Sequence, residues 1–118
     1  MTERRRRYRL GLRAEVLCAW YLRLRGWRIL ARRYRSPFGE IDIVARRRGL
    51  IAFVEVKARR DPQVALASVG ARQKRRVRRA AEHFIGAHPS LADLDLRFDV
   101  MVMSSWSLPL HVIDAWRD

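Results

Sequence analysis

The sequence has no long apolar run, a single cysteine and only two lysines. No stretch approaches the ~18 apolar residues that a membrane-spanning helix needs, so we expect no membrane partner. Cys18 cannot form an internal disulfide, which fits a reducing compartment. Charges such as Arg13 and Glu15 interrupt the place where a targeting signal would have its apolar core. We therefore expect a mature cytoplasmic protein, with the nucleoid as a place of association.

Acidic residues are scarce, 12 against 26 basic residues, which gives a net charge of +14. Such a charge favours polyanions, nucleic acid before an anionic membrane surface. Because 49% of the residues are apolar, a disordered basic tail is excluded as a description of the whole chain. All basic residues except Lys57 and Lys74 are arginine. An ammonium is a compact charge with a tunable pKa, so Lys57, which follows a strand of buried type, is a candidate functional residue.

The pattern predicts one domain over residues 1–118, with residues 1–7 as a flexible basic arm. We expect helices over 8–25 and 69–87 and strands over 27–35, 40–46, 50–59, 94–103 and 110–116. The inner face of the first helix is expected to carry Leu10, Ala14, Leu17, Tyr21 and Leu24. The fold class is then α/β, with a mixed central sheet of about five strands flanked by helices in the order αβββαββ.

The stretch "DIVARRRGLIAFVEVKARR" (42–60) places charged residues inside strands that otherwise look buried. Arg48-Gly49 is predicted to be a two-residue hairpin loop, with glycine supplying a positive φ. That register sets Asp42 directly across from Glu55, at a non-hydrogen-bonded position, with Lys57 on the same face. A four-residue loop would leave the two acids diagonal on one face. A three-residue loop would separate their faces unless a bulge restored the phase.

Two carboxylates facing each other repel, so something must offset their charge. One explanation is an ordinary ion pair with Lys57. The other is a divalent cation: Mg²⁺ is commonly held by one or two carboxylates and bridges to phosphate oxygens. An ammonium nearby then orients the attacking water or stabilises developing charge. We expect Mg²⁺ as the cofactor, with Mn²⁺ as a substitute.

These motifs resemble those of the PD-(D/E)xK nuclease superfamily. "FGEIDIVA" followed by "FVEVKARR" closely resembles the YraN-like family of bacterial predicted nucleases, which are related to archaeal Holliday-junction resolvases. "GLRAEVLCAWYLRLRGWRIL", "ARQKRRVRRAAEHFI" and "LRFDVMVM" extend the resemblance over most of the chain. The resemblance implies a restriction-endonuclease-like fold.

The resemblance also implies roles for individual residues. Asp42, Glu55 and the Val56 carbonyl would bind the metal, Lys57 would be catalytic, and Glu15 would be a supporting acid. Relatives often have glycine where this chain has Ala14, and Glu15 lies at the margin of the helix face, either solvated or aimed into a cleft. The expected nucleic-acid-binding residues are Arg46, Arg47, Arg48, Arg59, Arg72, Gln73, Lys74 and Arg75, with Gln73 and Lys74 near the scissile phosphate.

The first functional hypothesis is a Mg²⁺-dependent endonuclease that cleaves DNA, including branched DNA, with RNA as a further substrate class. The alternative is a non-catalytic nucleic-acid-binding module with the same fold. A homodimer would suit a symmetric junction. The histidines (His83, His88 and His111) lack metal-ligand spacing. Asp99 is expected to have a structural role, paired with Arg97 or a helix arginine.

Overall fold

The computed structural model describes residues 2–59, 61–104 and 108–116, and for residues 3–10 the backbone alone. Its elements are α1 (Glu3–Leu24), β1 (Arg28–Ser36), β2 (Gly39–Arg47), β3 (Leu50–Ala58), α2 (Pro62–Ala67), α3 (Ala71–Ala87), a 3₁₀ turn (Pro89–Leu91), β4 (Asp95–Met103) and β5 (Leu110–Val112). This order confirms the predicted α/β class, and it is compatible with a restriction-endonuclease-like fold.

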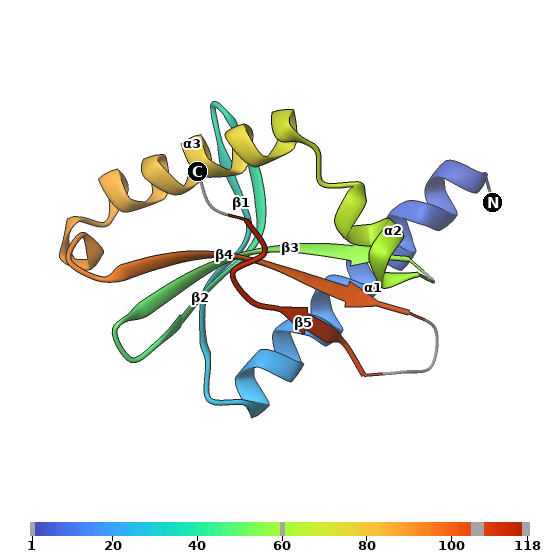
Figure 1. The fold of residues 1–118 in the computed structure, drawn as a ribbon, viewed down its shortest axis with the longest axis horizontal. Helices are drawn as coiled ribbons and strands as arrows, with labels where there is room; N and C mark the ends of the chain where they lie inside the picture. The colour runs from blue at the N-terminus through green and yellow to red at the C-terminus, as the bar shows by residue number, and fades with distance from the viewer. Residues whose placement is uncertain (1, 60, 105–107, 117–118) are drawn as a thin grey trace.

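The five strands form one sheet in the order β1-β2-β3-β4-β5. Neighbours are antiparallel except β3 and β4, which are parallel. A parallel pair needs a long crossover, and α2 and α3 lie in the connection between these two strands. Figure 1 shows α3 above the sheet and α1 on its opposite side. The sheet is therefore mixed and covered on both faces, as predicted.

Each face of the sheet has its own apolar core. The α3 face buries Phe53 and Val100 against Val77 and Phe84 of the helix. The α1 face buries Ile43 and Met101 with Trp27 and with Cys18 and Leu22 of the helix. Along β3 and β4, alternate residues enter opposite cores, which is the period-two pattern of strands. Among the described residues, no helix is long and apolar enough to cross a membrane.

The first helix differs from its prediction in two ways. It begins at Glu3, so most of the segment expected as a flexible arm continues the helix. The predicted inner face was also wrong at Leu17 and Leu24, which are 52% and 85% exposed. The buried side of the helix instead carries Ala14, Cys18, Ala19 and Leu22, and the first three of these are small residues. Small residues let the helix lie close to the strands, and this packing outweighed the larger leucines on the other side.

Two local predictions needed correction. The short helix α2 was missed, although Asp61 caps it by accepting a 2.9 Å hydrogen bond from the Gln63 N–H, and Pro62 occupies its first turn. In the β2–β3 loop, the positive φ belongs to Arg48 (56°) and not to Gly49. A two-residue hairpin turn can require a left-handed φ at its first position alone, and arginine takes that position here.

Asp99 has the structural role that the sequence predicted. It is fully buried and accepts two hydrogen bonds from Arg97, at 2.8 and 2.9 Å, and one from the Asp114 N–H. Its Oδ2 lies 2.7 Å from Nε2 of His111. Although burial alone would raise the pKa of Asp99, these partners hold it below its ordinary value. The buried charge is thus fully paired and ties β4 to β5.

Candidate active site

The β2–β3 hairpin brings the candidate site together. Its register runs from the pair Arg47↔Leu50 to the pair Ile43↔Val54, which confirms the two-residue loop. The next backbone pair, Asp42 with Glu55, does not form; the Asp42 side chain takes its place, and Oδ2 accepts a 2.8 Å hydrogen bond from the Val56 N–H. The acids are therefore adjacent as predicted, but at the point where the two strands part.

The pairing of β1 with β2 is interrupted in the same row. The pairs Arg32↔Ile43 and Tyr34↔Ile41 form, but the pair between them, Arg33 with Asp42, does not. Arg33 has a left-handed φ of 53°. Such a backbone conformation is strained for a residue with a side chain. The facing of β2 also changes at this level of the sheet: Ile41 packs on the α3 side, whereas Ile43 packs on the α1 side. Asp42 lies between them, where the ordinary alternation of the strand changes.

Helix α3 supplies a residue that links the two charged side chains of β3. The Gln73 amide donates from Nε2 to Glu55 Oε2 at 2.7 Å, and its Oε1 accepts from Lys57 Nζ at 3.4 Å. An amide has one donor end and one acceptor end, so these two partners fix its orientation. Lys57 and Glu55 therefore project from the same face of the strand, toward α3.

Glu55 is buried, Asp42 is half-buried, and both are poorly neutralised. Glu55 is 4% exposed, and its Oε1 has no hydrogen-bond partner among the described residues. Burial, with the neighbouring Asp42 carboxylate adding to it, raises the pKa of Glu55 to about 8. Burial also raises the pKa of Asp42, against the opposing effects of the Val56 N–H and of Lys57. The protein thus holds two carboxyl groups whose charges its own residues do not fully compensate.

Glu15 of α1 approaches this site from the other side of the sheet. It is 5% exposed, which decides between the two alternatives left open by the sequence: it is not solvated. Arg32 lies 3.5 Å from Glu15 Oε1, an ion pair that includes no hydrogen bond to that oxygen. Burial and the charge of Asp42 both raise the pKa of Glu15. Burial and the charges of Asp42 and Glu15 also raise the pKa of the nearby Cys18 thiol to about 12.

The chemistry of these residues fits a hard divalent cation. Carboxylate oxygens are the ligands that Mg²⁺ prefers, and it is commonly held by one or two of them with water completing its shell. Asp42 and Glu55 supply such a pair, and the unpartnered Glu55 Oε1 is a free ligand position. Within the described ranges, no group of three or more His, Cys, Asp or Glu residues forms a fuller metal cluster. The Val56 carbonyl as a ligand stays a prediction.

The expected nucleic-acid-binding residues divide by position. Arg59 follows the end of β3 that carries Lys57, and Arg72 with Gln73 lies at the start of α3. Lys74 instead lies over the Trp116 ring, with Nζ 6.0 Å from its centroid. Arg75 is exposed on α3. The start of α3 therefore places Gln73 at the acids, and its neighbour Lys74 against the core.

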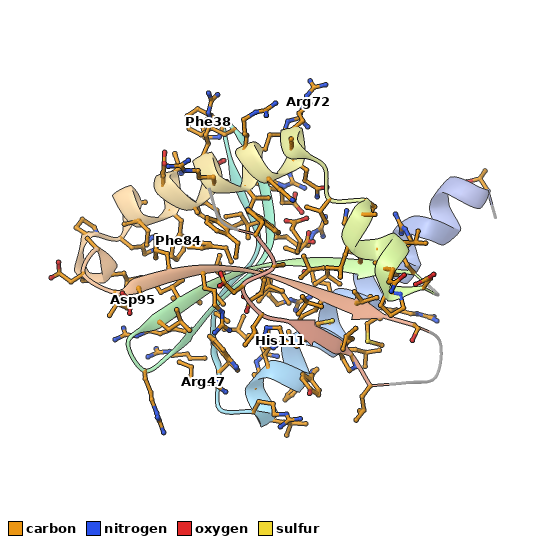
Figure 2. All side chains as sticks on the ribbon, viewed as in Figure 1. Phe38, Arg47, Arg72, Phe84, Asp95 and His111 are labelled. Atoms are coloured by element: carbon orange, nitrogen blue, oxygen red, sulfur yellow. The ribbon has the colours of Figure 1, made fainter. Side chains whose placement is uncertain are left out.

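The loop arginines Arg46–Arg48 are remote from the acids. At ~3.3 Å per residue, Arg47 lies roughly 17 Å along β2 from Asp42. Its guanidinium stacks 4.6 Å from the Trp27 ring centroid and donates a 3.3 Å hydrogen bond to the Arg25 carbonyl. Figure 2 shows Arg47 below the sheet and Arg72 above it. Arg47 is thus engaged in packing, and the structure does not bring this loop to the site.

Glu40 was missed as a member of the site. It pairs with Arg33 at 3.7 Å and Arg35 at 3.3 Å, and its charge contributes to the raised pKa of both Asp42 and Glu55. The sequence held a signal for it. Glu40 and Asp42 stand two apart in a predicted strand, a spacing that would place them on one face of a regular strand, although the alternation of faces changes at Asp42 in the structure.

Comparison with known proteins identifies the relatives of this chain. A model of the "Uncharacterised protein family UPF0102" matches residues 14–103. A UPF0102 protein of Parvibaculum lavamentivorans is 53% identical, over 93% of this chain and 83% of the relative. UPF0102 proteins of Rhodopseudomonas palustris and Bradyrhizobium diazoefficiens are 51% and 53% identical over 97% of this chain, and over 88% and 86% of their own lengths. The matched range contains Glu15, Asp42, Glu55, Lys57 and Gln73.

Proposed function

Because this chain belongs to the UPF0102 family, the YraN-like group of predicted nucleases, we propose that it is a metal-dependent nuclease that hydrolyses phosphodiester bonds in DNA. One observation carries the proposal. Glu55 is buried beside Asp42 with an unpartnered oxygen, and Lys57 is held next to it by Gln73. A protein that needed only a stable core would gain from an apolar or neutral residue at position 55.

Each residue then has a defined part. Asp42 and Glu55 would hold Mg²⁺, or Mn²⁺ in its place, and the bound ion supplies a Lewis acid and lowers the pKa of its water. The Lys57 ammonium would orient the attacking water or stabilise charge on the phosphate oxygens. The water oxygen bonds to phosphorus, the bond from phosphorus to the leaving oxygen breaks, and that oxygen takes up a proton. Gln73 keeps Lys57 in position, and Glu15 lies behind Asp42.

The arginines would act on the sugar-phosphate backbone. Phosphate contacts position a nucleic acid without reading its sequence, and the charge of +14 supports strong binding at low salt. The proposal therefore predicts cleavage that depends on the shape of the substrate and not on its base sequence.

The test is a panel of labelled linear duplex, branched, single-stranded and RNA substrates, each with Mg²⁺, with Mn²⁺ and with a chelator. Wild type is compared with Lys57→Ala and Asp42→Asn, and with Lys74→Ala as a control that removes the other lysine of the chain. We expect Lys57→Ala and Asp42→Asn to bind but not cut, and Lys74→Ala to retain cleavage. Absence of metal-dependent cleavage by wild type on every substrate would contradict the proposal.

A second function, nucleic-acid binding without catalysis, is favoured by one observation. The described residues hold only a pair of carboxylates near Lys57, without a third close ligand side chain. This alternative predicts binding that weakens steeply with salt, and no cleavage in any arm of the same panel. It also predicts that Lys57→Ala and Lys74→Ala behave alike.

A further inference from the structure

A hollow opens beside the acidic site, between the β1–β2 turn and the start of α3. It is lined by Gly39, Glu40, Gly70, Arg72, Gln73 and Arg76, among others, and has a volume of about 420 Å³. Gln73 belongs to both places, because its side chain also bonds Glu55 and Lys57. A group bound in this hollow, which we call the α3–turn hollow, would therefore lie next to the reacting centre.

The α3–turn hollow has a net basic lining. Arg72 and Arg76 are four residues apart on α3, so they share one side of the helix. Among the residues that the structure describes, neither has an ion pair or a side-chain hydrogen bond, unlike Arg47 or Arg97. The opposing acid, Glu40, is already paired with two arginines of β1, at 3.7 and 3.3 Å. Within the described part of the chain, both guanidinium groups thus remain for an anion, and guanidinium groups match phosphate geometry.

Hydrogen bonds hold the shape of the β1–β2 turn on one side of the hollow. Ser36 Oγ accepts from the Phe38 and Gly39 N–H groups at 3.1 and 3.2 Å, and donates to the Gly39 carbonyl at 2.8 Å. Gly39 has a φ of 150° and lies so close to α3 that an added Cβ would be 3.5 Å from Arg76 Cβ. Its backbone conformation is one that side chains rarely adopt, so glycine lets the turn pack against the helix. Figure 2 shows this turn, at Phe38, rising beside α3.

Building on the proposed function, we infer that the α3–turn hollow receives one unpaired nucleotide of the DNA strand next to the bond that is cut, with its phosphate on Arg72 and Arg76. The volume lies within the ~300–1,000 Å³ of pockets that enclose a single small ligand. A hollow of about 420 Å³ has room for one nucleotide and not for a base pair together with both of its sugar-phosphate backbones. The substrate class is therefore a duplex with a single-stranded tail or branch, and not a continuous duplex.

Gly70 allows a test that leaves the fold intact. Its φ is −77°, an ordinary value for any residue, and nothing lies within 4 Å of an added Cβ. It is the N-cap of α3, where serine and aspartate are both preferred. Gly70→Asp and Gly70→Ser should therefore both fold, and only the first adds a negative charge to the hollow.

The measurement is fluorescence anisotropy of full-length protein with a chelator present, so that no cleavage occurs. The probes are a blunt duplex and the same duplex carrying a short single-stranded tail. We expect wild type and Gly70→Ser to prefer the tailed probe, and Gly70→Asp to lose at least about tenfold in affinity for it with a smaller effect on the blunt duplex. Equal binding of both probes by wild type, or equal behaviour of the two variants, would overturn the inference.

A second pair of variants keeps the total charge matched. Arg72→Ala/Arg76→Ala removes the two arginines of the hollow, and Arg75→Ala/Arg79→Ala removes two exposed arginines with the same spacing on the same helix. Both pairs should reduce binding to the blunt duplex similarly, and only the first should abolish the preference for a tail.

These outcomes separate the inference from the proposed function. A preference for tailed DNA in a protein that cuts nothing would leave the hollow standing and refute the nuclease proposal. Metal-dependent cleavage without any preference for a tail would support the nuclease proposal and refute the inference about the hollow.

Discussion

Replacing Glu55 by glutamine is expected to stabilise the metal-free protein at neutral pH and above. Burial and Asp42 raise the pKa of Glu55 from 4.5 to about 8. Between these values the folded chain holds a proton that the unfolded chain has released, so the free energy of unfolding falls as pH rises. The slope is ~1.4 kcal/mol per pH unit, which amounts to about 3 kcal/mol at pH 7. This is an upper limit, because the pKa of Asp42 is raised as well.

Urea unfolding with a chelator, at about pH 5 and about pH 8, measures this difference. Glu55→Gln should match wild type at the lower pH and exceed it most at the higher pH. Glu82→Gln, which changes a glutamate whose side chain is 67% exposed, is the control and should follow wild type at both. Mg²⁺ should then raise the unfolding midpoint of wild type and of Glu82→Gln but not of Glu55→Gln, because only the first two keep both Asp42 and Glu55. A Glu55→Gln variant less stable than wild type at the higher pH would refute the reasoning.

Three further predictions concern residues around the site and in the core. Gln73→Ala should lower metal-dependent cleavage by ~10- to 100-fold, because it releases the two side chains that the amide orients; unchanged rates would exclude that role. Asp99→Asn should destabilise the fold by ~3 kcal/mol in urea, because it breaks a charge pair whose acid is fully buried and whose Arg97 is half-buried. In wild type, the lowered pKa of Asp99 gives a stability contribution that is present above its ordinary pKa and lost as pH falls through the folded value. Arg47→Ala should cost ~1 kcal/mol of stability through its lost contact with Trp27, with DNA affinity close to that of the matched Arg48→Ala variant; a selective loss of affinity would show that Arg47 binds DNA.

Elements whose signal is local were predicted well. In α3, Val77, Ala80, Ala81 and Phe84 recur with helical spacing, and all four are buried. The β2–β3 hairpin followed from two alternating strands around a two-residue loop. In α1, by contrast, apolar residues lie on both sides of the helix. Only contact with the sheet decides which side is buried, so local spacing selected the wrong leucines.

The candidate site also has features that are set locally and features that are set by tertiary packing. The proximity of Asp42, Glu55 and Lys57 follows from the hairpin register alone, and sequence reasoning found it. The parting of the strands at Asp42 coincides with the left-handed backbone of Arg33 in the neighbouring strand, and no pattern in the sequence predicts either feature. The bridge made by Gln73 depends on where α3 crosses the sheet. Both are products of tertiary packing, which overrides local preference.

Strand β1 forms one rim of the sheet and is open along nine residues. Exposed rims invite strands of other molecules, the first step toward fibres. This one carries a register shift near Leu30 and the left-handed Arg33, so a second molecule would meet a bent and interrupted ladder. The irregularity beside the candidate site thus also makes this rim a poor template for pairing with a strand of a second molecule.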